Sequence, residues 1–230
     1  MSTRLLTTIC RVASPAAFGA LLLGVTPGCQ LWPWGVTKDR TTIITPGMRA
    51  ASIREMGPRA READREAQTR ACEQLALQIR TEPDPIVRRA IQETAAEFDT
   101  PMASAMLLAG LQDEDRDVKV ACCRLLGKRQ DPKAVEPLSA LVSTESDLDV
   151  RLAAVDALGA MKTKAGMAGL AAALKDRDPA LQYAGVEAMK KVSDKDLGND
   201  VQAWRSYADS VIGAAPAASI AAQPTETTVK

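Results

Sequence analysis

Four basic side chains recur at one register of the sequence and are its clearest candidates for binding chemistry. They are Arg49, Arg88, Lys119 and Arg151, separated by 39, 31 and 32 residues. If each sits on its own helix and the helices stack, the cations form a stripe that could bind an anionic partner. Each also lies one turn from a capping position of its own or the neighbouring copy of the pattern, so structural ion pairing is the favoured role.

Other residue types limit the chemistry further. The chain has 230 residues, 29 basic and 29 acidic, a formal net charge of zero and no histidine. The lack of histidine excludes Ser-His-Asp and Cys-His catalysis, histidine metal ligands and a histidine pH switch. The charge balance is unlike that of a nucleic-acid-binding protein. No phosphate-binding loop, nucleophile elbow or calcium loop occurs. We therefore expect no catalytic residue, no metal and no cofactor.

Three cysteines remain as possible nucleophiles. Cys72, Cys122 and Cys123 lie in helical patterns, and adjacent cysteines on a helix cannot pair with each other. No CxxC or metal-ligand spacing is present. Small buried side chains are the favoured interpretation, and a redox or metal role is the alternative.

The elements that would position these residues are copies of one unit. Val87, Val118, Val150 and Leu181 open the same pattern at intervals of 31, 32 and 31 residues, and a fifth copy opens at Met48. The fourth residue of the copies is alanine. Small or apolar residues at offsets 0, 3, 4, 7 and 8 form one face of a helix. Only seven aromatic residues occur, and alanine-rich sequences favour closely packed helices.

Each copy carries signals for where its helix begins and ends. A side chain that accepts backbone N–H groups stands three residues before each opener, often followed by proline. Glycines 57, 127 and 159 are expected to take left-handed caps at the helix ends. The expected N-caps, including one for a last helix, are Thr45, Asp84, Asp115, Asp147, Asp178 and Asp200.

Second helical stretches connect the copies. They cover residues 101–111, 132–142 and 164–174, and a longer one covers 61–81, which explains the interval of 39. Pro137 is expected to kink the second of them. One helix pair cannot bury its apolar face alone, so the pairs should stack into a continuous core.

The repeated pattern resembles a known family. Its D-x-x-V-R-x-x-A-x-x-A-L-G signature, clearest in "DLDVRLAAVDALG" (147–159), is similar to HEAT repeats of the short class also found in phycobilisome-lyase-type proteins. The resemblance covers residues 45 to about 192. It implies an all-α, right-handed α-solenoid of about five stacked HEAT-like helix pairs with a C-terminal capping helix. It also implies Asp–Arg ladders along the stack, which Gln182 would end.

The last helix resembles the element that closes many bacterial HEAT-like arrays. In "DLGNDVQAWRSYA" (196–208), Trp204 is expected to cover the last repeat and Arg205 to face water. Stacking of Trp204 on a ligand is the alternative.

The first residues are typical of a secretory signal. Arg4 and Arg11 precede a short apolar run at 16–25. The following Gly28-Cys29 resembles the end of a bacterial lipobox, although Thr26 and Pro27 depart from the usual pattern. A signal peptide over 1–28 and lipidation of Cys29 are expected, and ordinary secretion or an uncleaved anchor are the alternatives.

Three segments follow from these boundaries. Residues 29–44 would be a membrane-proximal tether, in which Trp32 and Trp34 lie at the headgroups or pack on the first helix. Residues 45–212 would form the repeat domain, and the Ala/Pro/Thr-rich residues 213–230 a disordered tail.

Together these features predict a scaffold and not an enzyme. We expect a bacterial cell-envelope protein, anchored on the periplasmic side of the inner or outer membrane, that binds protein partners on one solenoid face and does not bind nucleic acid. The alternative is a chromophore- or ligand-handling protein of the bilin-lyase type, which would need a nucleophilic cysteine. No motif of the sequence indicates the partner, the binding face of the solenoid or the oligomeric state.

Overall fold

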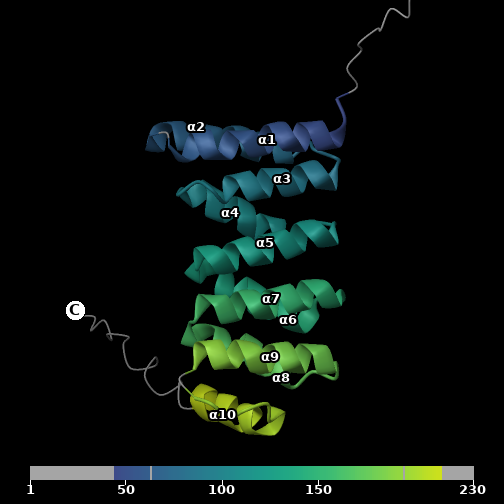
Figure 1. Ribbon diagram of the computed structural model, residues 1–230, viewed down its shortest axis with the longest axis vertical. Coiled ribbons are helices and arrows are strands. Elements are labelled where there is room, and N and C mark those ends of the chain that lie inside the picture. The colour runs from purple at the N-terminus through teal and green to yellow at the C-terminus, as the bar shows by residue number, and fades with distance from the viewer. Residues whose placement is uncertain (1–43, 63, 194, 214–230) are drawn as a thin grey trace, which may run out of the picture. The chain divides into compact units, whose positions relative to one another are not determined.

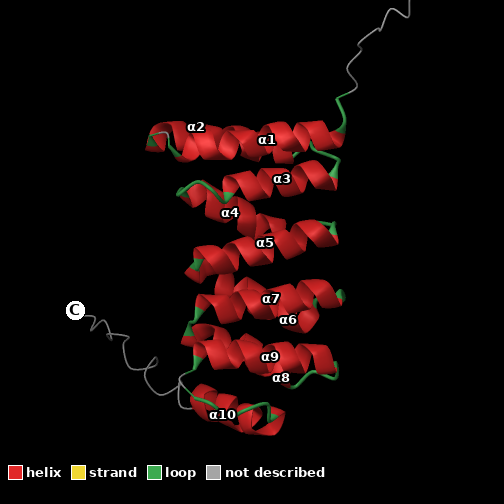
Figure 2. Ribbon diagram, in the orientation of Figure 1, coloured by secondary structure: helices red, strands yellow, loops and turns green. Residues whose placement is uncertain are grey.

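The computed structural model describes residues 44–62, 64–193 and 195–213. This part of the chain consists of helices and short connections and has no strand (Figure 2). None of its helices has the length and apolar character needed to cross a membrane. The predicted signal peptide, Cys29, Trp32, Trp34 and the predicted disordered tail from 214 onward lie outside the described residues. The described helices are α1 (Pro46–Arg61), α2 (Arg65–Ile79), α3 (Pro85–Ala95), α4 (Pro101–Gly110), α5 (Arg116–Arg129), α6 (Val135–Thr144), α7 (Leu148–Met161), α8 (Met167–Leu174), α9 (Pro179–Val192) and α10 (Val201–Gly213).

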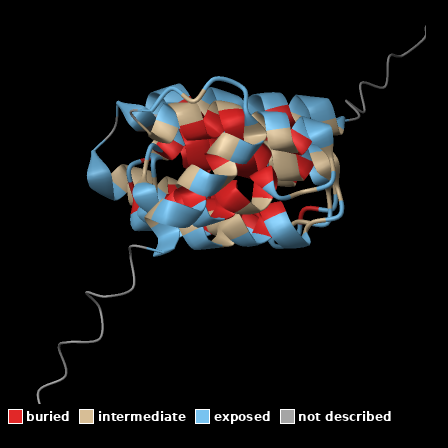
Figure 3. Cartoon of the chain, turned by 90° about the horizontal axis from the view of Figure 1, so that it is seen from below, coloured by how far each residue is buried: buried red, intermediate tan, exposed pale blue. Residues whose placement is uncertain are grey.

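The helices form two layers that follow chain order. The odd-numbered helices, which carry the repeated pattern, each pack against the next odd-numbered helix (Figure 1). In the second layer, α2 packs on α4, α6 on α8 and α8 on α10. Buried residues lie between the layers and exposed residues on their outer faces (Figure 3). The all-α repeat solenoid predicted from the sequence is therefore confirmed over the described residues.

Side-chain caps start the helices of the first layer and the last helix, α10. Asp84 accepts the backbone N–H of Ile86 at 2.9 Å, and Asp115 accepts that of Val118 at 3.1 Å. A hydrogen bond of this kind satisfies one of the N–H groups that the first turn leaves unpaired. The remaining capping side chains bond in the same way, at 3.3 Å from Thr45, 2.9 Å from Asp147, 2.8 Å from Asp178 and 2.8 Å from Asp200.

The glycines near the ends of these helices do not take left-handed caps, contrary to the prediction. Helix α5 continues past Gly127 and α7 past Gly159, and the left-handed residues are Gln130 (φ 53°) and Lys162 (φ 51°). A Cβ on Gly127 would lie 2.8 Å from the Cα of Ala157, on the neighbouring helix. Gly127 and Gly159 are needed because two helices approach closely there, which the sequence of one repeat alone does not reveal.

Two expectations for the second layer were also wrong. The segment 61–81 is not one helix, because α1 runs on to Arg61 and Asp64 caps α2 by accepting the N–H of Ala67 at 2.7 Å. Pro137 does not kink a helix. A 3-10 turn, Pro132–Ala134, comes first, and α6 begins at Val135, so Pro137 falls in the first turn, where its missing N–H costs little.

Helix α4 breaks the regularity of the second layer. Helix α3 has 11 residues, whereas α5, α7 and α9 have 14, and α4 begins without the 3-10 turn that precedes α6 and α8. Helices α4 and α6 consequently lack the close contact that α6 makes with α8. The buried core is divided within the same helix, α4. Buried apolar residues form one cluster from Ala50 to Met106 and a second from Leu107 to Ala208.

Candidate functional site: a charged ladder and the groove beside it

The four recurring basic residues lie near the start of α1, α3, α5 and α7 and pair with acidic residues of the connections between helices. The sequence suggested the capping aspartates as partners, and this was wrong. The partner is the acidic residue two positions before the cap of the following repeat. The pairs are Arg49–Glu82 at 2.6 Å, Arg88–Asp113 at 2.8 Å, Lys119–Glu145 at 2.5 Å, and Arg151–Asp176. We call this set of four pairs the ladder.

Each acidic partner also fixes the backbone of the cap that follows it. Asp113 accepts the N–H of Asp115 at 2.8 Å, and Glu145 accepts that of Asp147 at 3.2 Å. Glu82 and Asp176 do the same for the next cap, at 3.1 and 2.8 Å. The ladder thus connects the start of one repeat helix to the start of the next. The sequence contained a signal for these partners, because positions 82, 113, 145 and 176 have the same 31, 32 and 31 spacing as the helix openers.

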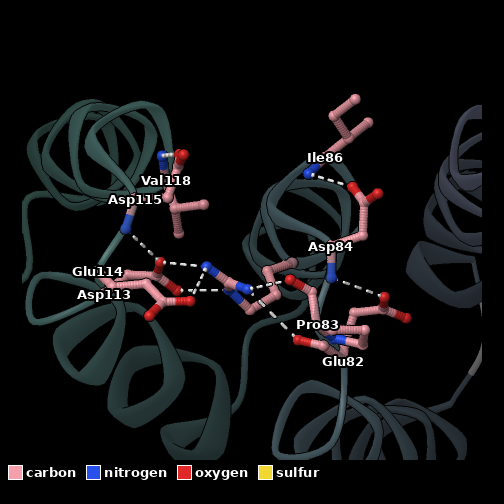
Figure 4. A network of polar contacts seen from close by, with 9 residues as sticks. Glu82, Pro83, Asp84, Ile86, Asp113, Glu114, Asp115 and Val118 are labelled. Atoms are coloured by element: carbon pink, nitrogen blue, oxygen red, sulfur yellow. Dashed lines mark hydrogen bonds and ion pairs between the residues drawn. The ribbon is translucent and has the colours of Figure 1, made fainter.

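Arg88 is the most buried of the four basic residues, with 7% of its surface exposed. Figure 4 shows Glu82, Pro83, Asp113 and Glu114, whose oxygens accept its hydrogen bonds. Its Nε and Nη2 donate to the two carboxylate oxygens of Asp113 at 2.9 and 2.8 Å, and Nη2 also contacts Glu114 at 3.2 Å. Its Nη1 donates to the carbonyl of Pro83 at 2.8 Å and of Glu82 at 3.4 Å. The hydrogen bond to Asp113 raises the pKa of Arg88. With its N–H groups engaged, Arg88 has no donor left for an external anion.

The other rungs are also engaged within the described residues. Lys119 holds the pKa of Glu145 down, at about 2, through its hydrogen bond, with help from the backbone N–H of Asp147. Arg151 donates through Nε to the carbonyl of Val142 at 2.8 Å. At the fifth register Gln182 replaces the cation and donates to the Asp176 carbonyl at 2.6 Å. The stripe suggested by the sequence is therefore a set of closed ion pairs, which agrees with the structural role that the sequence favoured.

A groove lies beside the Arg88–Asp113 rung. Its volume is about 350 Å³, and its walls come from the end of α2, the middle of α3 and the length of α4. The walls are mostly apolar, and the rung forms one polar patch. The lining residues are Ala76, Ile79, Arg80, Arg88, Gln92, Met102, Ala105, Met106, Ala109, Gly110 and Asp113.

Gln92 is the unusual residue of this groove. It is 2% exposed, and its Nε2 donates to the Met106 carbonyl at 3.2 Å, but its Oε1 has no hydrogen-bond partner among the described residues. Gly110 makes room for it, because a Cβ there would lie 2.6 Å from the Gln92 Nε2. A buried acceptor without a partner costs roughly 1–3 kcal/mol. Sequence reasoning did not single out Gln92, although the other four copies carry an apolar residue at the same position, five residues after the opener.

The cysteines are not placed for nucleophilic chemistry. Cys72, Cys122 and Cys123 are buried, and burial raises the pKa of each thiol, that of Cys123 to about 12. Only the thiolate is a good nucleophile, so these thiols are poorly reactive in this state. No group of three or more acidic or cysteine side chains within the described ranges could hold a metal ion.

Trp204 closes the C-terminal end of the array. It is fully buried, its Nε1 donates to the Gly198 carbonyl at 2.9 Å, and its ring meets that of Tyr207 edge-on with centroids 5.9 Å apart. This arrangement leaves no ring face for a stacked ligand. Arg205 does not face water alone as expected, because its Nε donates to the Leu174 carbonyl at 2.7 Å.

Comparison with known families agrees with this geometry. A family model described as HEAT repeats matches residues 72–159, from within α2 to the end of the repeated pattern in α7. A second model, described as the PBS lyase HEAT-like repeat, matches residues 150–176. A search of curated proteins found no match to this chain. The matched residues, the stacked helix pairs and the ladder between them show that residues 72–176 are built of HEAT-like repeats.

Proposed function

We propose that this chain is a non-catalytic scaffold that binds protein partners along its helical array. HEAT repeats generally mediate protein interactions, and the described residues form such an array. The observation that supports the proposal best is the closed ladder. Its charges hold the repeats in register, and the groove next to it offers apolar surface that the fold leaves uncovered.

We further propose that the scaffold is extracytoplasmic and membrane-tethered. The support is the sequence alone: a basic start, a short apolar run and a cysteine at a lipobox-like position. Metabolic labelling with palmitate, followed by intact-mass measurement, tests this. Incorporation that disappears in Cys29→Ala supports the tether, and labelling that survives Cys29→Ala contradicts it.

The bilin-lyase alternative receives no support from the described residues. It requires a reactive cysteine, and burial raises the pKa of all three described thiols. A direct measurement is mass spectrometry of the purified full chain after incubation with a bilin. The scaffold proposal expects no thiol adduct, and a covalent adduct on Cys72, Cys122 or Cys123 would favour the alternative.

Crosslinking tests the scaffold proposal itself. A photoreactive amino acid at Ala109, an exposed residue of α4 that lines the groove, should crosslink to a reproducible protein partner in envelope membranes. Absence of any protein crosslink from Ala109 and from a second position on each layer would contradict a protein-binding role. The two proposals can be contradicted independently, because membrane tethering depends on Cys29 and partner binding depends on the helical array.

A further inference from the structure

The repeats serve as internal controls for one another and single out Gln92. Five residues after the opener, four copies carry an apolar residue that is buried, namely Ile53, Cys123, Val155 and Val186. In the α3 copy this position is Gln92, which is just as buried but has an unpaired Oε1. The fold does not need a polar residue at this register, since the other copies pack without one. An unsatisfied buried group therefore requires another explanation.

A second departure accompanies it in the same place. Gly110 occupies the position that Leu141 and Ala173 hold in the following repeats, and a side chain there would collide with Gln92 and with the Cys122 Sγ. Both changes are found at the groove between α2 and α4. These two linked departures from the repeat lie beside the groove, where the second layer of the described helices is irregular.

We propose that the groove between α2 and α4 binds an extended peptide segment of a protein partner, whose backbone or side-chain N–H donates to the Gln92 Oε1. This inference rests on the proposed scaffold function and names its site. The segment would place apolar side chains on two alternate residues against the groove wall and an acidic residue near Arg80. Alternate side chains of a strand lie about 6.6 Å apart, and the wall from Met102 to Ala109 is about 10 Å long. The two anchors therefore fit along it.

The chemistry of the groove favours a peptide over other occupants. A hydrocarbon chain has no donor for Oε1, and a peptide in a helix has used most of its backbone N–H groups, whereas an extended peptide has them free. A free anion would find Arg88 already saturated. Arg80 lines the groove, is exposed and forms no ion pair within the described residues, so it complements an acidic side chain.

The walls can adapt to the occupant. The Gln92 Oε1 is covered in the described state, so a donor reaches it only if neighbouring side chains move. Met102 and Met106 line the groove, and the unbranched thioether side chain rearranges at low cost. The volume of about 350 Å³ is at the lower end of the range of ligand pockets, which suits one or two side chains.

A displayed library of random dodecapeptides, selected on the immobilised full chain, is the probe for this site. Enriched peptides should share two apolar residues at alternate positions next to an aspartate or glutamate. A synthetic peptide of this kind should bind the full chain and lose at least about tenfold in affinity with Ala109→Glu. Ala140→Glu is the matched control, because Ala140 is the exposed equivalent of Ala109 one repeat later, on α6, and should bind as the native chain does.

Gln92→Met separates binding from folding. Methionine has a similar shape without the acceptor, so this variant should unfold at an equal or higher urea concentration yet bind the peptide about five- to tenfold more weakly. Peptides that bind equally well to the native chain and to Ala109→Glu would contradict the groove as the binding site, but they would still be compatible with a scaffold function. Failure to enrich any peptide also contradicts the proposed peptide site. The crosslinking experiment with positions on both layers then tests the scaffold function separately. Saturable binding of laurate that Ala109→Glu blocks would mean that the groove binds an acyl chain and not a peptide, which would contradict the inference.

Discussion

At the scale of the residue, the array depends on charges that are enclosed by their partners. Arg88 is held by both oxygens of Asp113, whose side chain is 11% exposed. Asp113→Ala should lower the free energy of unfolding by about 3 kcal/mol, because the guanidinium stays buried without its carboxylate. Glu114→Ala is the control. Glu114 contacts the same guanidinium but is 85% exposed, so its loss should change stability by less than about 0.5 kcal/mol. Urea denaturation measures both, and equal effects would contradict the buried-rung argument.

The Lys119–Glu145 rung predicts a dependence on pH. The folded state holds the pKa of Glu145 down, at about 2, compared with its ordinary value of 4.5. Between these two values the unfolded state binds more protons, so the contribution of this carboxylate is complete above pH 4.5 and is lost as the pH falls towards 2. The shift corresponds to roughly 3 kcal/mol.

Glu145→Gln tests this dependence. The difference in the free energy of unfolding between the native chain and this variant should have its full value from about pH 5 to neutral pH and should shrink steadily as the pH falls from there towards 2. Glu136→Gln, at an exposed position of α6 without an ion pair in the described part, is the comparison and should differ little from the native chain at any pH. A difference for Glu145→Gln that stays constant with pH would contradict the assignment of the rung.

At the scale of the element, the close approach of α5, α7 and α9 depends on two glycines. Gly127→Ala would place a Cβ 2.8 Å from the Ala157 Cα, and Gly159→Ala one 2.8 Å from the Ala188 Cβ. Because backbone is hard to displace, Gly127→Ala should lower the free energy of unfolding by about 1–3 kcal/mol. Gly57→Ala in α1 is the matched control. Its Cβ would meet nothing nearer than 3.5 Å, so the higher helix propensity of alanine should make this variant neutral or more stable. Thermal unfolding that ranks the variants in the opposite order would contradict this account.

How far the elements could be predicted depends on whether the information is local. The helix starts were readable because a cap such as Asp84 acts on the amide of Ile86, two residues away. The role of Gly127 was not, because the atom it makes room for belongs to a helix about 30 residues later. Only the basic half of the ladder could be predicted from the sequence. The basic residues stood out, but Glu82 and its equivalents look like ordinary loop charge until their 31-residue spacing is compared. The unpaired state of Gln92 depends on where Met106 and Gly110 lie, which no local pattern contains.

At the scale of the whole array, the core is divided. One buried cluster spans α1 to the first half of α4, and the other spans the rest of α4 to α10. In repeat proteins each unit contacts only its neighbours, so stability is close to a sum of local terms. A division of the core at α4 should therefore let the two parts open separately.

Hydrogen exchange under native conditions tests this division. Phe98 is fully buried in the first cluster, and Phe98→Ala should cost about 3–5 kcal/mol there. Amide protection should fall in α1, α2 and α3, while α7, α8 and α9 keep the protection of the native chain. Leu158→Ala, in the second cluster, is the reciprocal variant and should reverse the pattern. An equal loss of protection throughout the described helices in both variants would mean that the array unfolds as one cooperative unit. If the division holds, the groove between α2 and α4 crosses the boundary between the two parts, and a peptide bound there should restore the protection of α2 and α4 first.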